Sequence, residues 1–541
     1  MLMQSTNETI LVDGAAEQPP CMVLPDILRW QADRLGEAPF LDICGRQISF
    51  AGMDRLSNRY AVALRGLGLG QGDRIAILLP NCLEFVVTWF AASKLGAIEV
   101  PSNPGLRGPL LVHNIVNCGA RILVTNHAAL AEIAKVQNEI PEVTTLLLVD
   151  ASPEDARACG IRIETILPFD IGLESPDSFE PVAVSPQDPM AILYTSGTTG
   201  AAKGVVMSHR QCFGWVEAMA RNLGYTSDDS YFSALPLFHT DAQMFGVYMP
   251  LVFGTRGTLV ERFSASRFWD QLRACDASAT NLLGAMAVIL TRAPVQEGED
   301  NQPVRVCQCI PMVPDKAGFE QCFGMTLVTG YGQTETSFVT LDTVDDVKDG
   351  ACGRPHPDWE VAIFGPDDEP LPPNVMGEIV SRPRLSWAMF SGYYNQPQKT
   401  VETLRNLWYH SGDAGYMDED GWLYFSHRLN EAIRRRGENV SAYEVELIAE
   451  QHPAVVESAA FGVKSEFTEE DIMIVVMQRA GAGLLAADVL EHFRAHAPGH
   501  MVPRYIEVTD DPLPRTPTEK ISRAELKKRG VGLRTLDADR R

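Results

Sequence analysis

The sequence predicts an α/β protein with a large N-terminal domain, made of α/β subdomains plus a β-rich subdomain, and a small α+β C-terminal domain. Three observations predict this organisation. Helix-like and strand-like segments alternate over residues 24–184, Gly and Pro residues punctuate residues 359–423, and a fresh set of elements begins beyond Arg428. A length of 541 residues also exceeds what one hydrophobic core holds, so two to four structural units are expected.

The alternation in the first part of the chain predicts βαβ units. Residues 26–35 form an amphipathic, helix-like segment, residues 74–79 are typical of a buried strand, and residues 84–95 are helix-like again. Further strand-like runs occupy residues 121–125, 145–149, 191–194 and 258–260. Because helical patterns separate many of these runs, we expect a largely parallel sheet.

The later segments have different patterns. Short alternating runs such as residues 377–380 lie between Gly and Pro residues, which is typical of a small β-rich subdomain. Beyond Arg428 the predicted elements are a helix, two strands and a second helix, at residues 442–451, 458–463, 471–478 and 487–495. This C-terminal part has the size of an independent α+β domain of roughly 110 residues.

Composition excludes several classes of function. The formal net charge of -24 repels nucleic acid and anionic membranes, so a phosphate-bearing ligand must be held by local donors and cations. Eleven cysteines are scattered, with only Cys307 and Cys309 close together, and they lack the repeated spacing of a zinc site or a disulfide framework. We therefore expect reduced thiols.

No targeting or membrane-spanning segment is expected. The N-terminus carries acidic residues and no basic region before an apolar run, unlike a signal peptide. The longest mostly apolar stretches, residues 277–291 and 243–255, are shorter than the ~20 residues that cross a bilayer. A cytoplasmic location follows as the expectation.

The most informative stretch is residues 194–204, YTSGTTGAAKG, directly after an apolar strand-like run. Glycines let backbone N–H groups face an anion, hydroxyls add donors, and Lys203 adds a positive charge, so a triphosphate fits. The stretch is not a Walker loop, because Gly204 follows the lysine. A flexible linker is the alternative. The predicted phosphate-binding residues are Thr195, Ser196, Gly197, Thr198, Thr199, Gly200 and Lys203.

These residues closely resemble the signature of the adenylate-forming superfamily of acyl-CoA synthetases, adenylation domains and luciferases. Further motifs of that family stand in order at residues 331–335, 409–413, 437–439 and 517–520, and the resemblance covers nearly the whole chain. It implies ATP, Mg2+ and coenzyme A as ligands. It also implies a large ATP- and acyl-binding domain at residues 1–427 and a small mobile domain, carrying the catalytic lysine, at residues 428–541.

In the large domain the resemblance assigns roles around the nucleotide. Glu335 could be a solvated turn residue, whereas the resemblance makes it a Mg2+ ligand, with Thr195 as a second oxygen donor. It assigns Thr334 to the α-phosphate. Tyr331, which could equally be a core residue, is placed to stack on adenine. The neighbouring nucleotide-binding residues are Gly330 and Gly332.

Three later residues complete the expected ATP site. Asp413 could cap a turn, but by resemblance it accepts hydrogen bonds from both ribose hydroxyls, joined there by Arg428. Lys520 could be an exposed tail lysine; by resemblance it is catalytic. A point charge has a role there, because carboxylate attack on the α-phosphate crowds negative oxygens together. Glu519 departs from the glycine usual before this lysine.

His239 is the remaining catalytic candidate. A core histidine is the ordinary interpretation, but in related acyl-CoA ligases this position lies near the acyl pocket and can gate the thiol tunnel. Amino-acid-activating relatives commonly have aspartate there, so an ordinary α-amino acid substrate is disfavoured. The acyl pocket is expected from residues 238–245, 281–286 and 307–311, whose apolar and small polar side chains suit a modest or aromatic acid better than a long chain.

The resemblance implies two half-reactions served by one rotation of the small domain. Lys520 serves acyl-AMP formation; rotation then presents Gly437 and Glu438 to the thiol. The expected hinge is Asn430, where Asp or Lys is usual. Arg435 belongs to a basic cluster, 434–436, which is either a solvated helix face or a contact for coenzyme A phosphates.

The branch that the C-terminal motifs resemble most is that of crotonobetaine/carnitine-CoA ligases. The expected activity is that of an AMP-forming acid–thiol ligase acting on a small-molecule carboxylic acid. For the oligomeric state, a homodimer is left open. Alternatives to coenzyme A as the acceptor are a carrier-protein thiol, an amine, or nitrite in the diazotisation of an aromatic amine. A non-catalytic nucleotide-binding scaffold is disfavoured, because it would not need both the phosphate-binding residues and a distant Lys520.

Overall fold

The computed structural model describes residues 12–195, 202–292, 302–429, 433–435, 438–440, 442–465, 470–497, 499–516 and 520–539. The chain forms two compact units. The first comprises Met1–Val361 and Ser381–Leu407, and the second Ala362–Val380 and Trp408–Arg541. The predicted α/β class is confirmed. Within the described ranges, no helix has both the length and the apolar character needed to cross a membrane.

One seven-stranded sheet of the first unit carries the phosphate-loop motif. Its strands, in spatial order, are β7 (Thr165–Pro168), β6 (Thr145–Val149), β5 (Ile122–Asn126), β3 (Arg74–Leu78), β4 (Ile98–Pro101), β8 (Pro189–Thr195) and β9 (Lys203–Ser208). Neighbours are parallel except β8 and β9, which pair antiparallel. The sheet thus confirms the parallel arrangement predicted from the alternating pattern, with one antiparallel edge at the motif.

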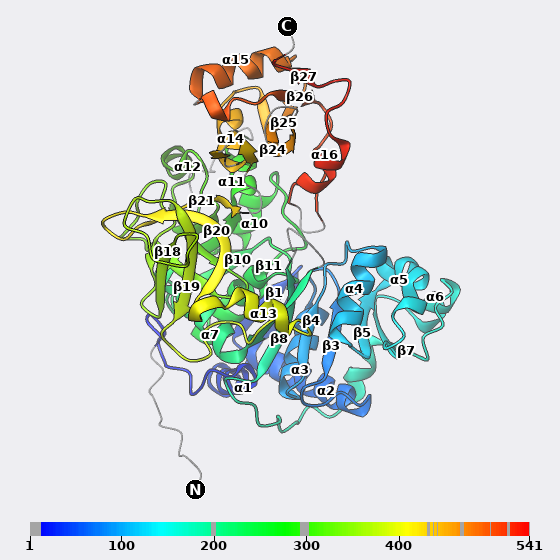
Figure 1. Ribbon diagram of the computed structural model, residues 1–541. Coiled ribbons are helices and arrows are strands. Elements are labelled where there is room, and N and C mark those ends of the chain that lie inside the picture. The colour runs from blue at the N-terminus through cyan, green and yellow to red at the C-terminus, as the bar shows by residue number, and fades with distance from the viewer. Residues whose placement is uncertain are drawn as a thin grey trace. The chain divides into compact units, whose positions relative to one another are not determined.

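Helices cover both faces of this sheet (Figure 1). Helices α4 (Gly108–Cys118) and α5 (Leu130–Val136) lie on one face, and α2 (Phe50–Gly66) and α3 (Leu83–Lys94) lie on the other. Ala76 and Leu78 belong to the same buried cluster as Leu111 of α4 and Ile133 of α5. In a strand, residues two apart point to the same face of the sheet. Ala76 and Leu78 therefore face the layer formed by α4 and α5, and the residues that alternate with them face the other layer.

The second seven-stranded sheet of this unit includes strands from distant parts of the chain. Its spatial order is β14 (Thr326–Val328), β13 (Val306–Ile310), β12 (Ala279–Leu283), β10 (Ser230–Ser233), β11 (Arg256–Leu259), β1 (Pro39–Ile43) and β2 (Arg46–Ser49). Strand β1 runs parallel to β11, with Leu41 opposite Gly257. Helix α7 (His209–Leu223) contacts β8 and β9 of the first sheet and β13 of the second. It therefore joins the two sheets.

Further helices and strands belong to the first unit. They are α1 (Leu24–Leu35), α6 (Pro153–Ala158), α8 (Thr240–Gln243), α9 (Met249–Phe253), α10 (Phe268–Cys275), α11 (Gly284–Arg292), α12 (Lys316–Phe323), β15 (Gly330–Gln333), β16 (Ser337–Leu341), β17 (Arg354–Pro355) and α13 (Pro397–Thr403). A π-helical turn, Met244–Tyr248, separates α8 from α9.

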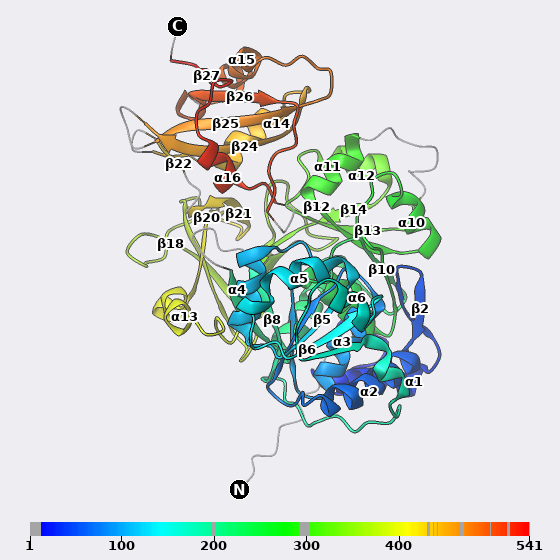
Figure 2. The same cartoon turned by 90° about the vertical axis from the view of Figure 1, so that its right-hand side faces the viewer.

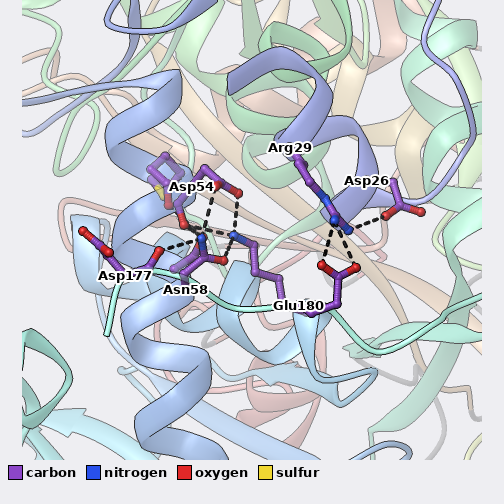
Figure 3. Close-up of polar contacts among 9 residues, drawn as sticks. Asp26, Arg29, Asp54, Asn58, Asp177 and Glu180 are labelled. Atoms are coloured by element: carbon purple, nitrogen blue, oxygen red, sulfur yellow. Dashed lines mark hydrogen bonds and ion pairs between the residues drawn. The ribbon is translucent and has the colours of Figure 1, made fainter. Parts of the chain in front are cut away.

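A buried lysine fixes the connection that leads into β8. Lys94 is fully buried, and its Nζ donates to Asp54 Oδ1 at 2.7 Å and to Asn58 Oδ1 at 2.6 Å. Asn58 in turn donates to the carbonyl oxygen of Asp177 at 3.0 Å, and Arg29 of α1 donates to Glu180 at 3.1 Å (Figure 3). Burial lowers the pKa of Lys94 to about 8. These bonds hold the segment before β8 against α1 and α2.

The second unit contains part of the predicted β-rich segment and the whole predicted α+β part. One sheet has the order β18 (Trp359–Phe364), β19 (Gly377–Pro383), β20 (Tyr409–Met417) and β21 (Leu423–Arg428). A second has the order β24 (Val455–Lys464), β25 (Glu470–Gln478), β26 (Tyr505–Thr509) and β27 (Leu536–Asp537), and β22 (Ile433–Arg435) pairs with β23 (Glu438–Val440). The predicted helices and strands beyond residue 440 are all present, within three residues of their expected ends.

Alternating residues give the C-terminal sheet two apolar faces, and helices lie over the sheet (Figure 2). Ile474 of β25 packs with α14 (Ala442–Glu450) and α15 (Ala486–His496), while Val475 packs with Leu526 of α16 (Arg523–Arg529). The sheet is therefore covered on both sides.

A buried carboxyl next to the second sheet predicts a pH-dependent stability. Asp342 is 1% exposed, neither of its carboxyl oxygens has a hydrogen-bond partner among the described residues, and burial raises its pKa from 3.8 to about 7. The folded protein therefore keeps this proton up to a higher pH than the unfolded chain, so stability falls as pH rises towards 7. We expect Asp342→Asn to remove this fall in stability with rising pH.

The measurement is chemical denaturation of both proteins across pH. The advantage of Asp342→Asn over the wild type should grow by about 2 kcal/mol between pH 5 and pH 8. The matched control is Asp345→Asn, at an exposed carboxylate three residues away, which should leave the pH profile unchanged. Parallel pH profiles for wild type and Asp342→Asn would contradict the expectation.

Candidate active site

The described parts of the phosphate-loop motif stand on two paired strands. Thr195 ends β8 and Lys203 begins β9, and the two residues are opposite each other in the antiparallel register. Next to the motif, the Tyr194 hydroxyl donates to Asn117 Oδ1 at 2.6 Å, and His113 Nε2 lies 2.8 Å from the carbonyl oxygen of Ala202. The predicted phosphate-binding residues Ser196, Gly197, Thr198, Thr199 and Gly200 lie outside the described residues.

The predicted Mg2+ ligand Glu335 is held rigidly by its backbone. Glu335 is 5% exposed and follows β15 in the turn to β16. Its carbonyl oxygen accepts from the backbone N–H of Phe390 at 2.8 Å and from Gln211 Nε2 at 3.2 Å. Gln211 also donates to the carbonyl oxygen of Thr334 at 2.9 Å. Helix α7 therefore positions both residues of the predicted phosphate and metal site.

Lys203 and Glu335 meet on the hydroxyl of Tyr393. The Tyr393 hydroxyl donates to Glu335 Oε1 at 2.7 Å and accepts from Lys203 Nζ at 3.1 Å. Lys203 Nζ also lies 4.4 Å from the centroid of the Tyr393 ring. The structure thus brings together the phosphate-loop lysine and the predicted metal ligand, through a residue that the sequence analysis did not single out.

The hairpin that carries Tyr331 depends on glycine. Tyr331 is half-buried on β15, opposite Thr340 of β16, with a register shift before Gly332. A Cβ at Gly332 would collide with the carbonyl oxygen of Ser337, and one at Gly330 would lie 2.9 Å from the carbonyl oxygen of Thr340. Ser337 itself has a left-handed φ of 61°, a strained conformation for a non-glycine residue. Close packing therefore fixes the shape of this predicted adenine-binding hairpin.

The donor set fits Mg2+ that arrives with a nucleotide. Mg2+ in such sites is held by one or two protein oxygens together with phosphate oxygens. Glu335 supplies a carboxylate and Thr195 a hydroxyl, both oxygen donors. Among the described residues, no group of three or more His, Cys, Asp or Glu side chains could hold a metal ion by itself. Both predicted ligands are thus oxygen donors of the kind that Mg2+ prefers.

The second unit brings together the two predicted ribose ligands. Asp413 on β20 is 3% exposed and stands opposite Arg428 at the end of β21, with Arg428 Nε 3.5 Å from Asp413 Oδ1. Glu378 of β19 fixes the residues just before Asp413 on β20, because its carboxylate accepts from the Gly412 N–H at 3.0 Å and lies 2.8 Å from His410 Nδ1. The sequence analysis did not anticipate the role of Glu378.

Lys520 lies in the second unit, in a loop closed by its own backbone. Its carbonyl oxygen accepts from the Thr516 N–H at 2.6 Å, and its N–H donates to Thr516 Oγ1 at 3.2 Å. Arg515 and Ile521 form an isolated antiparallel bridge beside it. The lysine is exposed at the end of this loop.

The predicted acyl-pocket segments belong to the first unit. His239 is half-buried directly before α8, and its ring lies 4.7 Å from that of Phe238. On β12, Asn281 is 3% exposed and its Oδ1 accepts from the Ser233 hydroxyl at 3.2 Å. Cys307 of β13 is fully buried. These segments combine apolar side chains with a few bonded polar groups.

Arg435 requires a correction. It lies on strand β22, not on a solvated helix face, and is 7% exposed. Its guanidinium donates to the carbonyl oxygen of Val502 at 2.6 Å, with Nε 3.7 Å from Asp471 Oδ1. Such a buried guanidinium supports the interior of its unit, and its contact with coenzyme A phosphates stays a prediction. Asn430 and Gly437 lie outside the described residues, and only the backbone of Glu438 is described.

Two family models match the chain. The model for AMP-binding enzymes matches residues 28–394, and the model for the AMP-binding enzyme C-terminal domain matches residues 444–520. The chain belongs to the AMP-binding enzyme family. This AMP-binding enzyme is 32% identical over 496 residues to crotonobetaine/carnitine–CoA ligase of Salmonella paratyphi B, covering 89% of this chain and 93% of the relative. The same ligase of Salmonella typhimurium is 32% identical over 497 residues, with the same coverage.

Solved structures share the fold of this AMP-binding enzyme. The anthranilate CoA ligase AuaEII in complex with anthranoyl-AMP has a TM-score of 0.85 at 22% identity, covering 94% of this chain and 96% of that structure. A benzoate CoA ligase from Burkholderia xenovorans LB400 has a TM-score of 0.81 at 21% identity, covering 93% of this chain and 99% of that structure. The family predicted from the ordered motifs is confirmed.

Proposed function

We propose that this AMP-binding enzyme activates a carboxylic acid with ATP as an acyl-AMP and then transfers the acyl group to coenzyme A. The observation that carries the proposal is the convergence of Lys203 and Glu335 on the Tyr393 hydroxyl, at the base of the phosphate-loop motif. A charged donor and a carboxylate side by side suit a triphosphate with its metal. The names of the curated relatives and solved neighbours, all acid–CoA ligases, agree with the predicted function.

In the first half-reaction, an oxygen of the substrate carboxylate attacks the α-phosphorus of ATP and pyrophosphate leaves. Mg2+, when bound, would neutralise phosphate charge there. Lys203 and Thr334 would hold phosphate oxygens, while Asp413 and Arg428 would hold the ribose. Lys520 would approach the crowded oxygens and stabilise the charge that develops between acid and phosphate. Its exposure leaves it accessible to a nucleotide.

In the second half-reaction, the thiol sulfur attacks the acyl carbon of the acyl-AMP, loses its proton, and AMP leaves. We place the division between the large and the small mobile domain at residues 427 and 428, with Asn430 as the hinge. Rotation would withdraw Lys520 and bring Gly437 and Glu438 to the thiol. His239 would stand near the acyl pocket, and the enzyme would work in the cytoplasm.

The acid is proposed to be small or aromatic. The Salmonella relatives are named for crotonobetaine and carnitine, and the solved neighbours for anthranilate and benzoate. We propose that the segments around Asn281 and Cys307 line the acyl pocket, where their apolar and small polar side chains suit such an acid better than a long chain.

A panel assay tests the function. Crotonobetaine, carnitine, benzoate, anthranilate and a long-chain fatty acid are each incubated with ATP and Mg2+, and pyrophosphate release is measured. We expect one compact acid to give pyrophosphate and, only when coenzyme A is present, equal amounts of AMP and thioester. ATP binding without pyrophosphate release from any acid would instead favour a nucleotide-binding scaffold.

The same assay separates the acceptors. Replacing coenzyme A with a carrier protein, an amine or nitrite should leave pyrophosphate formation intact and abolish turnover. Faster AMP release with one of these acceptors than with coenzyme A would overturn the choice of acceptor while leaving acid activation standing.

A further inference from the structure

Three segments far apart in the sequence meet at one hydroxyl group. Lys203 comes from β9, Glu335 from the turn between β15 and β16, and Tyr393 from the segment before α13. Tyr393 is 4% exposed, and its hydroxyl lies 3.1 Å from Lys203 Nζ and 2.7 Å from Glu335 Oε1. The tyrosine therefore connects the two charged side chains that the proposed function requires.

Backbone pairing places Tyr393 beside the strand that leaves the phosphate loop. The N–H of Tyr394 donates to the carbonyl oxygen of Gly204 at 2.8 Å, and the N–H of Val206 donates to the carbonyl oxygen of Gly392 at 3.1 Å. The Tyr393 N–H donates to Thr400 Oγ1 at 2.9 Å. On the opposite side, the N–H of Phe390 bonds the Glu335 carbonyl at 2.8 Å. One short segment is thus bonded to both β9 and the Glu335 turn.

The chemistry of the three groups fixes the direction of both hydrogen bonds. An ammonium group can only donate, and a carboxylate can only accept. A tyrosine hydroxyl has one proton to give and lone pairs to receive another, so it can satisfy both neighbours at once. Phenylalanine keeps the ring, and with it the cation–π contact to Lys203, but offers neither bond.

We infer that Tyr393 is a positioning residue for the nucleotide–metal site. It holds the Glu335 carboxylate so that one oxygen is bonded to the hydroxyl and the other is left for Mg2+, and it directs the Lys203 ammonium towards the phosphates. This inference rests on the proposed function. Without the hydroxyl, the carboxylate and the ammonium lose their common anchor, and metal-supported binding of ATP weakens.

The test is calorimetric titration of ATP into the full-length enzyme at a series of Mg2+ concentrations. No acid is added, so that binding is measured without turnover. Tyr393→Phe should raise the Mg2+ concentration for half-maximal ATP affinity about tenfold, the size expected for losing a bond to a charged group. Tyr394→Phe is the matched control, because Tyr394 lies next to Tyr393 on the same segment, half-buried beside Arg74. Its Mg2+ dependence should equal that of the wild type.

A double-mutant cycle separates positioning from general damage. If Tyr393 acts through Glu335, adding Tyr393→Phe to Glu335→Gln should shift the Mg2+ dependence much less than adding it to the wild type. Additive shifts would contradict the inference, as would identical Mg2+ dependence in Tyr393→Phe and wild type. Failure of the wild type to bind ATP with Mg2+ would instead count against the proposed function. Thermal melting of each variant shows whether the fold is retained.

Discussion

Lys520→Ala should lower the rate of acyl-AMP formation about 10³-fold, because it removes a charge that acts only as the transition state forms. Lys520 is an exposed residue next to the backbone bonds to Thr516, so its truncation removes no side chain from the buried core. We therefore expect the melting temperature to stay unchanged. The rate is measured as acid-dependent exchange of pyrophosphate into ATP.

The second half-reaction supplies the internal control. When synthetic acyl-AMP and coenzyme A are provided, Lys520→Ala should form thioester at the wild-type rate, since Lys520 is assigned only to adenylation. Lys527→Ala is the matched control in the same unit, at a lysine that pairs with Glu470 on the surface, and it should retain both activities. Loss of both half-reactions in Lys520→Ala would refute a role confined to the first.

Arg504→Met should destabilise the second unit by about 3 kcal/mol, since breaking a buried ion pair leaves an uncompensated charge. The Arg504 guanidinium is buried, donates to Asp471 Oδ2 at 2.8 Å and pairs with Asp537 at 3.2 Å. Asp471 is 4% exposed, so it cannot regain water when the arginine is removed. Arg435 then remains beside it at 3.7 Å, which limits the loss.

Hydrogen exchange followed by mass spectrometry measures this effect locally. Amides of β25 and β26 should exchange faster in Arg504→Met, while those of β3 and β5 in the first unit keep their protection. Arg494→Met, at a 56% exposed side chain on α15, should change neither. Uniform loss of protection throughout the chain would show that the two units do not unfold separately.

Local patterns were sufficient to predict the two helices and two strands named beyond residue 440. The period of 3.6 over residues 442–451 and the apolar run at 471–478 correspond to α14 and β25, because each buries its stripe against a neighbour in the chain. The pairing of β1 with β11 could not be predicted. The strands are separated by more than 200 residues, and nothing in either strand alone specifies its partner.

The site shows the same limit. Ordered motifs identified Lys203, Glu335 and Asp413, because each stands in a distinctive run of residues. Tyr393 stands in no such run, and its role depends on backbone pairing between distant segments. For Arg435 the sequence holds a signal for a strand, because Ile433 and Arg435 are two residues apart, as on one face of a strand, and both are buried.

The packing of the β15–β16 hairpin limits how the enzyme can be diversified. A side chain at residue 332 has no room against the Ser337 carbonyl, and one at residue 330 presses on Thr340. Saturation libraries aimed at new acids should therefore leave both glycines untouched and vary the segments around Asn281 and Cys307, which we propose to line the acyl pocket. Substitutions in those segments would leave the close contacts at residues 330 and 332 in place, so acid preference could be changed without rebuilding the β15–β16 hairpin.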